Sequence, residues 1–140
     1  MMYTADVSAP GALWGKGLRS TRAHALLVSV DASRARQVPG VHAVLTGADV
    51  PDVRVGISLQ DLPILARDKE RFIGDKIAAV AAETLDAAEE ALSLIEVAYK
   101  ELPAVSNITE AIATGAPIIH EQLAKYTGVP DRPQKHPNVL

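Results

Sequence analysis

Residues 71–103, RFIGDKIAAVAAETLDAAEEALSLIEVAYKELP, contain the stretch that decides the fold. Residues 77–83 contain a run of Ile, Ala and Val without alternation, which predicts a strand whose two faces are both covered. Thr84 follows at the position of a helix N-cap, and Asp86 lies in the first turn, where a carboxylate faces the positive end of the helix dipole. The sequence therefore predicts a buried strand that leads directly into the best-defined helix of the chain.

That helix has an apolar stripe and a polar face. The stripe consists of Leu85, Ala88, Leu92 and Ile95, and the residues expected to face water are Glu89, Glu90 and Ser93. Strand periodicity returns at 96–99, and Pro103 ends it. The whole segment is thus predicted as strand, helix, strand.

The N-terminal half adds three more predicted strands, at 12–19, 24–30 and 41–46. In the second of them Leu26, Val28 and Val30 are expected on one face. Asp31 is a good N-cap for a short helix over 32–38, which ends before Pro39-Gly40.

The remaining segments are shorter or polar. Residues 53–57 are predicted to be extended, residues 58–69 a surface connection, residues 71–73 a strand end, residues 109–114 a helix stopped by Gly115, and Ile118-Ile119 a last extended piece. Residues 1–126 are expected to form one α+β (mixed α/β) domain, and 127–140 a polar, proline-rich tail or linker to further domains.

Composition excludes several classes of protein. A formal charge of −3 without a run of Lys or Arg argues against nucleic-acid binding, and the absence of cysteine excludes thiolate metal sites and iron–sulfur ligation within this chain. The longest apolar run, 77–82, is far shorter than the roughly 20 residues of a membrane helix. The N-terminal residues do not resemble a secretory signal, so we expect a soluble, cytoplasmic protein.

The four histidines do not form a metal-binding pattern. His24, His42, His120 and His136 are widely spaced, and His120-Glu121 lacks the second histidine of H-E-x-x-H because Ala124 stands there. His24 and His120 are interpreted as hydrogen-bonded structural residues, and His136 as solvated.

Two further patterns could indicate a functional site, but a structural interpretation is favoured for both. Gly15-Lys16-Gly17 begins a dinucleotide fingerprint, but Ser20 replaces the third glycine and no strand–turn–helix surrounds it, so the glycines are interpreted as part of a curved strand. Asp61, Asp68 and Asp75 fall in predicted loops, where turn formation is the favoured interpretation over acid–base catalysis. The sequence therefore predicts no catalytic, cofactor-binding or metal-binding residue.

The order of segments nevertheless resembles one family, the N-terminal α/β-hammerhead domain of molybdenum hydroxylase large subunits (the xanthine dehydrogenase, aldehyde oxidase and carbon monoxide dehydrogenase type). The matching stretches are 3–6, 10–15, 18–25 (like the family's R-S-x-x-A-H-A strand), 31–35, 39–51, 63–66, 71–84, 87–91, 97–105 and 116–121. The chain departs from the family at Lys76, where proline is usual, and at Asp75, where Glu or Gln is usual. We expect this to change a turn and not the fold.

The resemblance implies a hammerhead fold, with a twisted mixed sheet, one long helix and one or two short ones. It also implies a scaffold and subunit-contact role in an oxidoreductase whose catalytic residues lie outside this chain. The parent complex would use a molybdopterin cofactor, [2Fe–2S] clusters and FAD, and its partners would be the downstream molybdopterin-binding domains or subunit, with FAD and iron–sulfur subunits. Relative to the family, both termini of the chain are expected to be truncated or separately encoded.

Two alternatives remain open from the residues alone. One is a stand-alone ligand-binding protein or enzyme that uses His24 or the 61–75 loop, which ligand-dependent thermal stabilisation would reveal. The other is an interaction module that reuses the same fold, which an exposed apolar face would favour.

Overall fold

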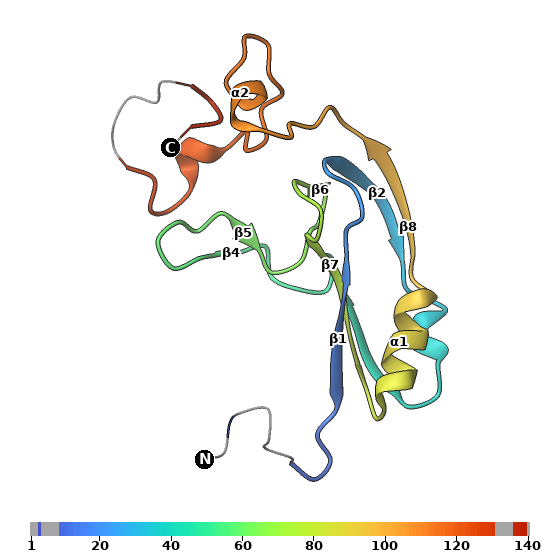
Figure 1. Cartoon of the computed structure of the whole chain (residues 1–140). Helices are drawn as coiled ribbons and strands as arrows, with labels where there is room; N and C mark the ends of the chain where they lie inside the picture. Colours follow the sequence, from blue (N-terminus) through green and yellow to red (C-terminus); the bar gives the residue numbers. More distant parts are fainter. Residues whose placement is uncertain (1–2, 4–8, 131–135, 140) are drawn as a thin grey trace.

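The computed structural model describes residues 3, 9–130 and 136–139, and its described strands form two three-stranded sheets and one two-stranded sheet. All of their pairings are antiparallel. The α+β class and the single long helix are as expected. The strands are divided among three sheets, however, and do not form one mixed sheet. Figure 1 shows the helix α1 (Leu85–Ser93) near one end of the molecule and the short helix α2 (Ile108–Ala111) near the other.

The first sheet has the order β1-β7-β3, with β7 (Lys76–Ala82) between β1 (Trp14–Arg19) and β3 (Val41–Thr46). Ile77, Ala78, Val80 and Ala82 are buried. The predicted strand is confirmed. Ala78, Val80 and Ala82 cover one face, whereas on the other face Ile77 is buried and Ala79 and Ala81 are partly exposed, so the expected coverage of both faces holds only in part.

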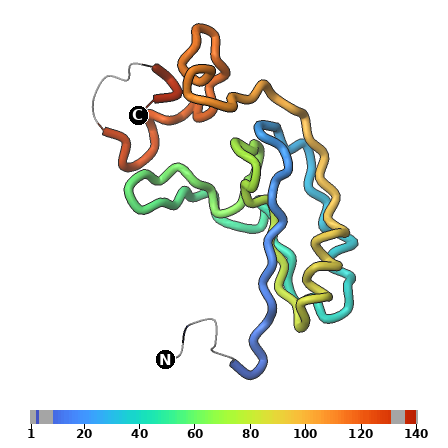
Figure 2. Tube along the Cα trace, in the orientation of Figure 1, coloured from blue at the N-terminus to red at the C-terminus, as the bar shows by residue number. Residues whose placement is uncertain are grey.

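The second sheet has the order β6-β2-β8, formed by β6 (Lys69–Glu70), β2 (Ala25–Asp31) and β8 (Glu96–Glu101). Figure 2 shows β2 and β8 side by side although they are far apart in sequence. Their register shifts between Leu27 and Ser29, and the intervening Val28 is 66% exposed. The expected single face of Leu26, Val28 and Val30 is therefore interrupted, because a bulge at Val28 breaks the alternation of side chains along β2.

Helix α1 begins at its predicted cap. The Thr84 hydroxyl accepts a hydrogen bond from the Ala87 N–H at 3.1 Å, and Glu89, Glu90 and Ser93 are exposed as expected. Ala91 is fully buried as well, although the predicted stripe omitted it. The helix packs on one face of the first sheet, and the shared core consists of Ala32, Ala35, Val38, Val44, Ala78, Val80, Ala82, Ala88, Ala91 and Ile95.

Three local predictions are corrected. The helix expected at 32–38 is a single 3-10 turn, η2 (Ala35–Gln37), because Asp31 ends β2 and its carboxylate accepts from the Ser33 N–H at 2.8 Å. Residues 58–69 are not a surface connection throughout, since Leu65 and Ala66 are buried. The same residues contain β5 (Leu62–Pro63), which pairs with β4 (Arg54–Val55). Residues 71–73, expected to end a strand, instead belong to a turn.

The segment after β8 is mostly irregular. Asn107 caps α2 by accepting from the Glu110 N–H at 2.9 Å, and Gly115 follows with a φ of +81°. Ile118 and Ile119 lie outside any strand, and a second 3-10 turn, η3 (Leu123–Lys125), comes later. The Asn138 amide donates to the carbonyl oxygens of Ala111 and Pro117, at 3.0 and 2.9 Å. Within the described ranges, no helix has the length and apolar character needed to cross a membrane.

Candidate functional site

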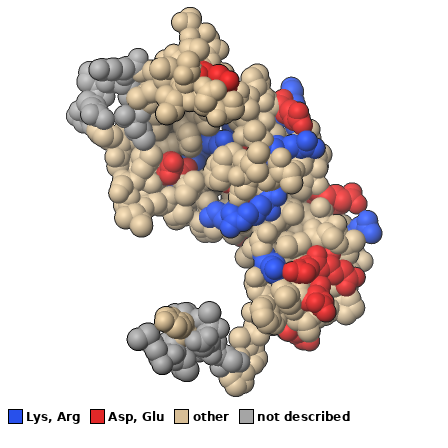
Figure 3. Space-filling view, viewed as in Figure 1, with Lys and Arg blue, Asp and Glu red and all other residues tan. Residues whose placement is uncertain are grey.

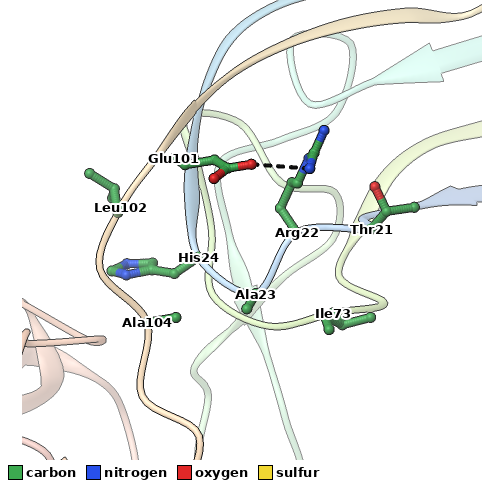
Figure 4. A pocket seen from close by; sticks show the side chains of 8 residues that line it. All are labelled: Thr21, Arg22, Ala23, His24, Ile73, Glu101, Leu102 and Ala104. Atoms are coloured by element: carbon green, nitrogen blue, oxygen red, sulfur yellow. Dashed lines mark ion pairs between the residues drawn. The ribbon is translucent and has the colours of Figure 1, made fainter.

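The best candidate site is a depression of about 300 Å³ that contains the sequence candidate His24 (Figure 4). Three segments form it: the connection from β1 to β2, the turn between β6 and β7, and the end of β8. Its lining residues are Thr21, Arg22, Ala23, His24, Ile73, Glu101, Leu102 and Ala104. The depression thus lies where the two larger sheets are joined by the chain.

His24 is held as a structural residue. It is buried, and its Nδ1 lies 2.6 Å from the Pro103 carbonyl oxygen. Because a carbonyl oxygen only accepts, Nδ1 carries the proton of this hydrogen bond. Its Nε2 is buried without a hydrogen-bond partner among the described residues. The arrangement agrees with the interpretation of His24 as a hydrogen-bonded residue at the start of a strand.

The charged groups of the depression neutralise each other. Arg22 Nη1 lies 3.0 Å from Glu101 Oε1, and both side chains are about half exposed or more. The Arg22 guanidinium also lies over the Tyr99 ring, 5.6 Å from its centroid. Burial raises the pKa of Tyr99, and the nearby Glu70 carboxyl adds to that rise. None of these described groups forms a nucleophile–base pair.

Two buried carboxyl groups lie at the same junction. The exposed fractions are 0% for Glu70 and 2% for Asp75. The Ser20 hydroxyl donates to Glu70 Oε2, whereas Glu70 Oε1 is buried and unpartnered among the described residues. Burial raises the pKa of Glu70, the nearby Asp75 raises it further, and the Ser20 hydrogen bond opposes the rise. Sequence reasoning missed Glu70, because nothing in its local pattern of charged neighbours distinguishes it from a surface residue.

The three loop aspartates have separate roles. Asp75 Oδ1 and Oδ2 accept from the N–H groups of Lys76 and Arg71, at 2.9 and 3.3 Å, which fixes the turn before β7. The Asp68 backbone oxygen accepts from the Leu27 N–H at 2.9 Å. Asp61 instead lines a second depression of about 400 Å³. Turn formation, the favoured interpretation, therefore holds for Asp75.

The remaining histidines have local partners. His120 lines the second depression, and its Nδ1 lies 3.4 Å from the Tyr126 hydroxyl. Burial and the nearby Arg71 lower its pKa, which favours the neutral imidazole. His42 Nε2 pairs with Glu83 Oε1 at 3.0 Å. His136 is only partly exposed, contrary to the expected solvation, and its Nδ1 accepts from the Asn138 N–H at 3.2 Å.

No metal or phosphate site emerges from these residues. Over 3, 9–130 and 136–139 there is no group of three or more His, Cys, Asp or Glu that could hold a metal ion. Gly15 and Gly17 lie inside β1, opposite Ala81 and Ala79 of β7, and Lys16 pairs with Glu89 at 2.8 Å. The glycines therefore belong to a strand, as expected, and not to a phosphate-binding turn.

The comparisons with known proteins agree on one family. The family model described as "Aldehyde oxidase and xanthine dehydrogenase, a/b hammerhead domain" matches residues 1–103. The chain is 48% identical over 122 residues to a probable xanthine dehydrogenase subunit of Bacillus subtilis (strain 168), covering 86% of this chain and 16% of that protein. It is 43% identical over 119 residues to the nicotinate dehydrogenase large molybdopterin subunit of Eubacterium barkeri, covering 84% of this chain and 28% of that protein.

Among solved structures, the Cu,Mo-CO dehydrogenase in its carbon monoxide-reduced state matches with a TM-score of 0.78 and 35% identity. The match covers 84% of this chain and 15% of that one. This chain thus spans between about one seventh and somewhat more than a quarter of the relatives named here. The junction of two antiparallel sheets, the capped helix α1 and these similarities lead to one conclusion: the chain belongs to the a/b hammerhead domain family of aldehyde oxidase and xanthine dehydrogenase.

Proposed function

We propose that this chain is a scaffold and subunit-contact domain of a molybdenum-dependent hydroxylase or dehydrogenase of the xanthine, aldehyde or carbon monoxide dehydrogenase type. The observation that carries the proposal is the family match over residues 1–103. The share of each relative that this chain covers is small, which fits a domain of a larger catalytic unit.

The complex would use a molybdopterin cofactor, with [2Fe–2S] clusters and FAD on other domains or subunits. The donor groups of this chain do not fit an iron–sulfur cluster. The chain has no cysteine, and its described residues bring no three metal-ligating side chains together. In this proposal the [2Fe–2S] clusters are bound by the partners, and the catalytic residues lie outside this chain.

The division of the chain is part of the same proposal. Residues 1–126 form the hammerhead domain, and residues 127–140 lead towards the molybdopterin-binding region. That region either continues this polypeptide or is a separate subunit. The contacts of Asn138 with Ala111 and Pro117 bring the end of the described chain back to the segment around α2.

A deletion experiment tests the scaffold role. The enzyme is prepared with and without residues 1–140, and folding, bound molybdenum and turnover of the remaining region are measured. We expect the truncated enzyme to lose its cofactor, and the separately added chain to restore cofactor retention. A truncated enzyme that folds and turns over at the full rate would refute the proposal.

A further inference from the structure

The second depression, of about 400 Å³, lies between two parts of the chain that are far apart in sequence. One side is formed by the connection between β4 and β5, and the other by the segment that follows α2. Figure 1 shows these two parts facing each other. We call this depression the hairpin pocket, and its lining includes Leu59, Asp61, Val105, Ile119, His120 and Leu123.

Contacts beside the hairpin pocket fasten its two sides to each other. The Gln60 N–H donates to the Thr127 carbonyl oxygen at 2.9 Å. The Arg54 guanidinium lies over the Tyr126 ring, 4.8 Å from its centroid. The walls are therefore held together before any ligand arrives, which lowers the entropic cost of binding.

The two arginines beside the hairpin pocket already have partners. Arg54 Nη1 donates to the Asp61 carbonyl oxygen at 2.8 Å. Arg71 Nε donates to the Ile119 carbonyl oxygen at 3.2 Å, and Arg71 Nη2 lies 3.7 Å from Glu121 Oε2. These guanidinium groups are thus committed to the walls and are poorly placed to attract an anionic ligand.

Asp61 differs from these arginines. Its side chain lines the pocket, and its carboxylate has no hydrogen bond or ion pair with any residue that the structure describes. Burial and the nearby Arg71 lower the pKa of His120, so the imidazole is neutral at neutral pH and would not repel a cation. The hairpin pocket therefore combines one unpaired negative charge with apolar walls.

The surroundings of Asp61 contrast with the most acidic surface of the molecule. Figure 3 shows acidic side chains gathered over the end that carries α1, whereas the end that carries α2 is mostly uncharged in the same view. The carboxylates of α1 are exposed, so water and salt screen them and they hold a cation weakly, whatever its shape. A carboxylate beside apolar walls attracts a cation more strongly, because the effective dielectric constant is lower there.

We infer that the hairpin pocket binds a small organic cation, with an amidinium, guanidinium or ammonium group on the Asp61 carboxylate and a flat apolar body between the walls. Small-molecule sites have volumes of about 300–1,000 Å³ and a mostly apolar lining with a few placed polar groups, as this pocket does. A planar amidinium can donate two parallel N–H bonds to a carboxylate. The inference is independent of the scaffold role, because the residues that carry it all lie in this chain.

Titration with benzamidine tests the inference. The protein is purified natively through a tag on this chain, with whatever polypeptides accompany it, and saturation-transfer-difference NMR measures the Kd. We expect saturable binding with a Kd on the order of 1 mM, which is typical of a ligand with so few non-hydrogen atoms. Benzamide has nearly the same shape without the charge, and benzoate has the opposite charge. Both should bind about tenfold more weakly or worse, because the charge-assisted hydrogen bonds are lost.

Two pairs of variants locate the binding. Asp61→Asn removes the charge at constant size, and Asp52→Asn makes the same change at an exposed position. Ala111→Leu fills part of the hairpin pocket, and Ala113→Leu adds the same atoms at an exposed position. We expect Asp61→Asn and Ala111→Leu to weaken benzamidine binding about tenfold or more, and both controls to stay within about twofold of the parent. Circular dichroism checks that each variant is folded.

Each contrary outcome overturns the inference. Absence of saturable binding would show that the pocket takes no such cation, and equal affinities for benzamidine and benzamide would show that charge is not recognised. Parent-like affinity in Asp61→Asn would exclude that carboxylate. Parent-like affinity in Ala111→Leu would place the cation elsewhere, as on the exposed carboxylates of α1. The comparison of benzamidine with benzamide uses the unaltered protein, so it decides the matter even if a variant does not fold.

Discussion

Replacement of Ile77 by alanine tests the central strand of the fold most sharply. Among the residues that the structure describes, Ile77 in β7 is the largest fully buried side chain, with 0% of its surface exposed. The change removes three carbon atoms from the interior. At about 0.8 kcal/mol for each buried methylene, the transfer contribution is ~2.4 kcal/mol.

The cavity adds to this cost. Three missing carbon groups leave on the order of 80 Å³ if the surroundings do not relax, and about 24 cal/mol per Å³ makes this ~2 kcal/mol. Ile77→Ala should therefore lower the free energy of unfolding by about 2.5 to 4.5 kcal/mol. Val28→Ala, at the exposed bulge of β2, is the control, with an expected change within about 0.5 kcal/mol.

Urea unfolding followed by circular dichroism measures both variants. A single domain of this size is expected to unfold in one transition, so midpoint and slope give the free energy. A loss below about 1 kcal/mol for Ile77→Ala, or a loss for Val28→Ala of similar size to that of Ile77→Ala, would contradict the burial of Ile77 in β7.

Three further predictions concern single contacts. In Gly47→Ala the new Cβ would lie 2.4 Å from the Ala66 carbonyl oxygen, so urea unfolding should show a loss of about 1–3 kcal/mol, and an unchanged midpoint would refute the close approach. Thr84→Ala removes the cap of α1 and should cost about 1 kcal/mol in the same assay, with Thr84→Ser close to the parent; equal losses would contradict the capping role. The raised pKa of Glu70 means that the folded chain holds this proton to a higher pH than the unfolded chain does. Its stabilising contribution is therefore complete below the ordinary pKa and is lost as pH rises through the raised value, and Glu70→Gln should flatten this part of the pH–stability profile and be at least as stable as the parent at pH 7. An unchanged pH dependence in Glu70→Gln would show that another group is responsible.

The sequence predicted those parts of the fold that depend on local signals. The strand at 77–83, the Thr84 cap and helix α1 follow from an uninterrupted apolar run, a hydroxyl side chain and a helical period. These signals lie within a few residues of each other, and the structure places them in the same order. The β1 assignment of Gly15 and Gly17 was predictable for the same reason.

Features set by distant partners could not be predicted. Val28 is exposed because β2 and β8 change register, which depends on a pairing between segments about seventy residues apart. Glu70 is buried because β6 pairs with β2 at the sheet junction. The 3-10 turn η2 stands where a longer helix was predicted, because Asp31, the predicted N-cap, is instead the last residue of β2. In each case tertiary pairing prevails over local propensity.

The candidate site was only partly predictable. His24 was recognised as a hydrogen-bonded strand residue, but its partner, the Pro103 carbonyl oxygen, is 79 residues away in the chain. The exposed Phe72-Ile73 pair lies inside a stretch that already resembled the family, yet only the structure shows that these side chains line a groove beside Ala104. An apolar residue in sequence does not reveal whether its own domain covers it.

The scaffold role is tested most simply by a native purification through a tag on this chain, with molybdenum, iron and the co-purifying polypeptides measured in the same fractions. Membership in a molybdenum hydroxylase predicts stoichiometric molybdenum and iron together with a molybdopterin-binding region, either in the same polypeptide or as a partner. A metal-free 14.8 kDa species without a partner would contradict the proposed role and leave only the hammerhead fold.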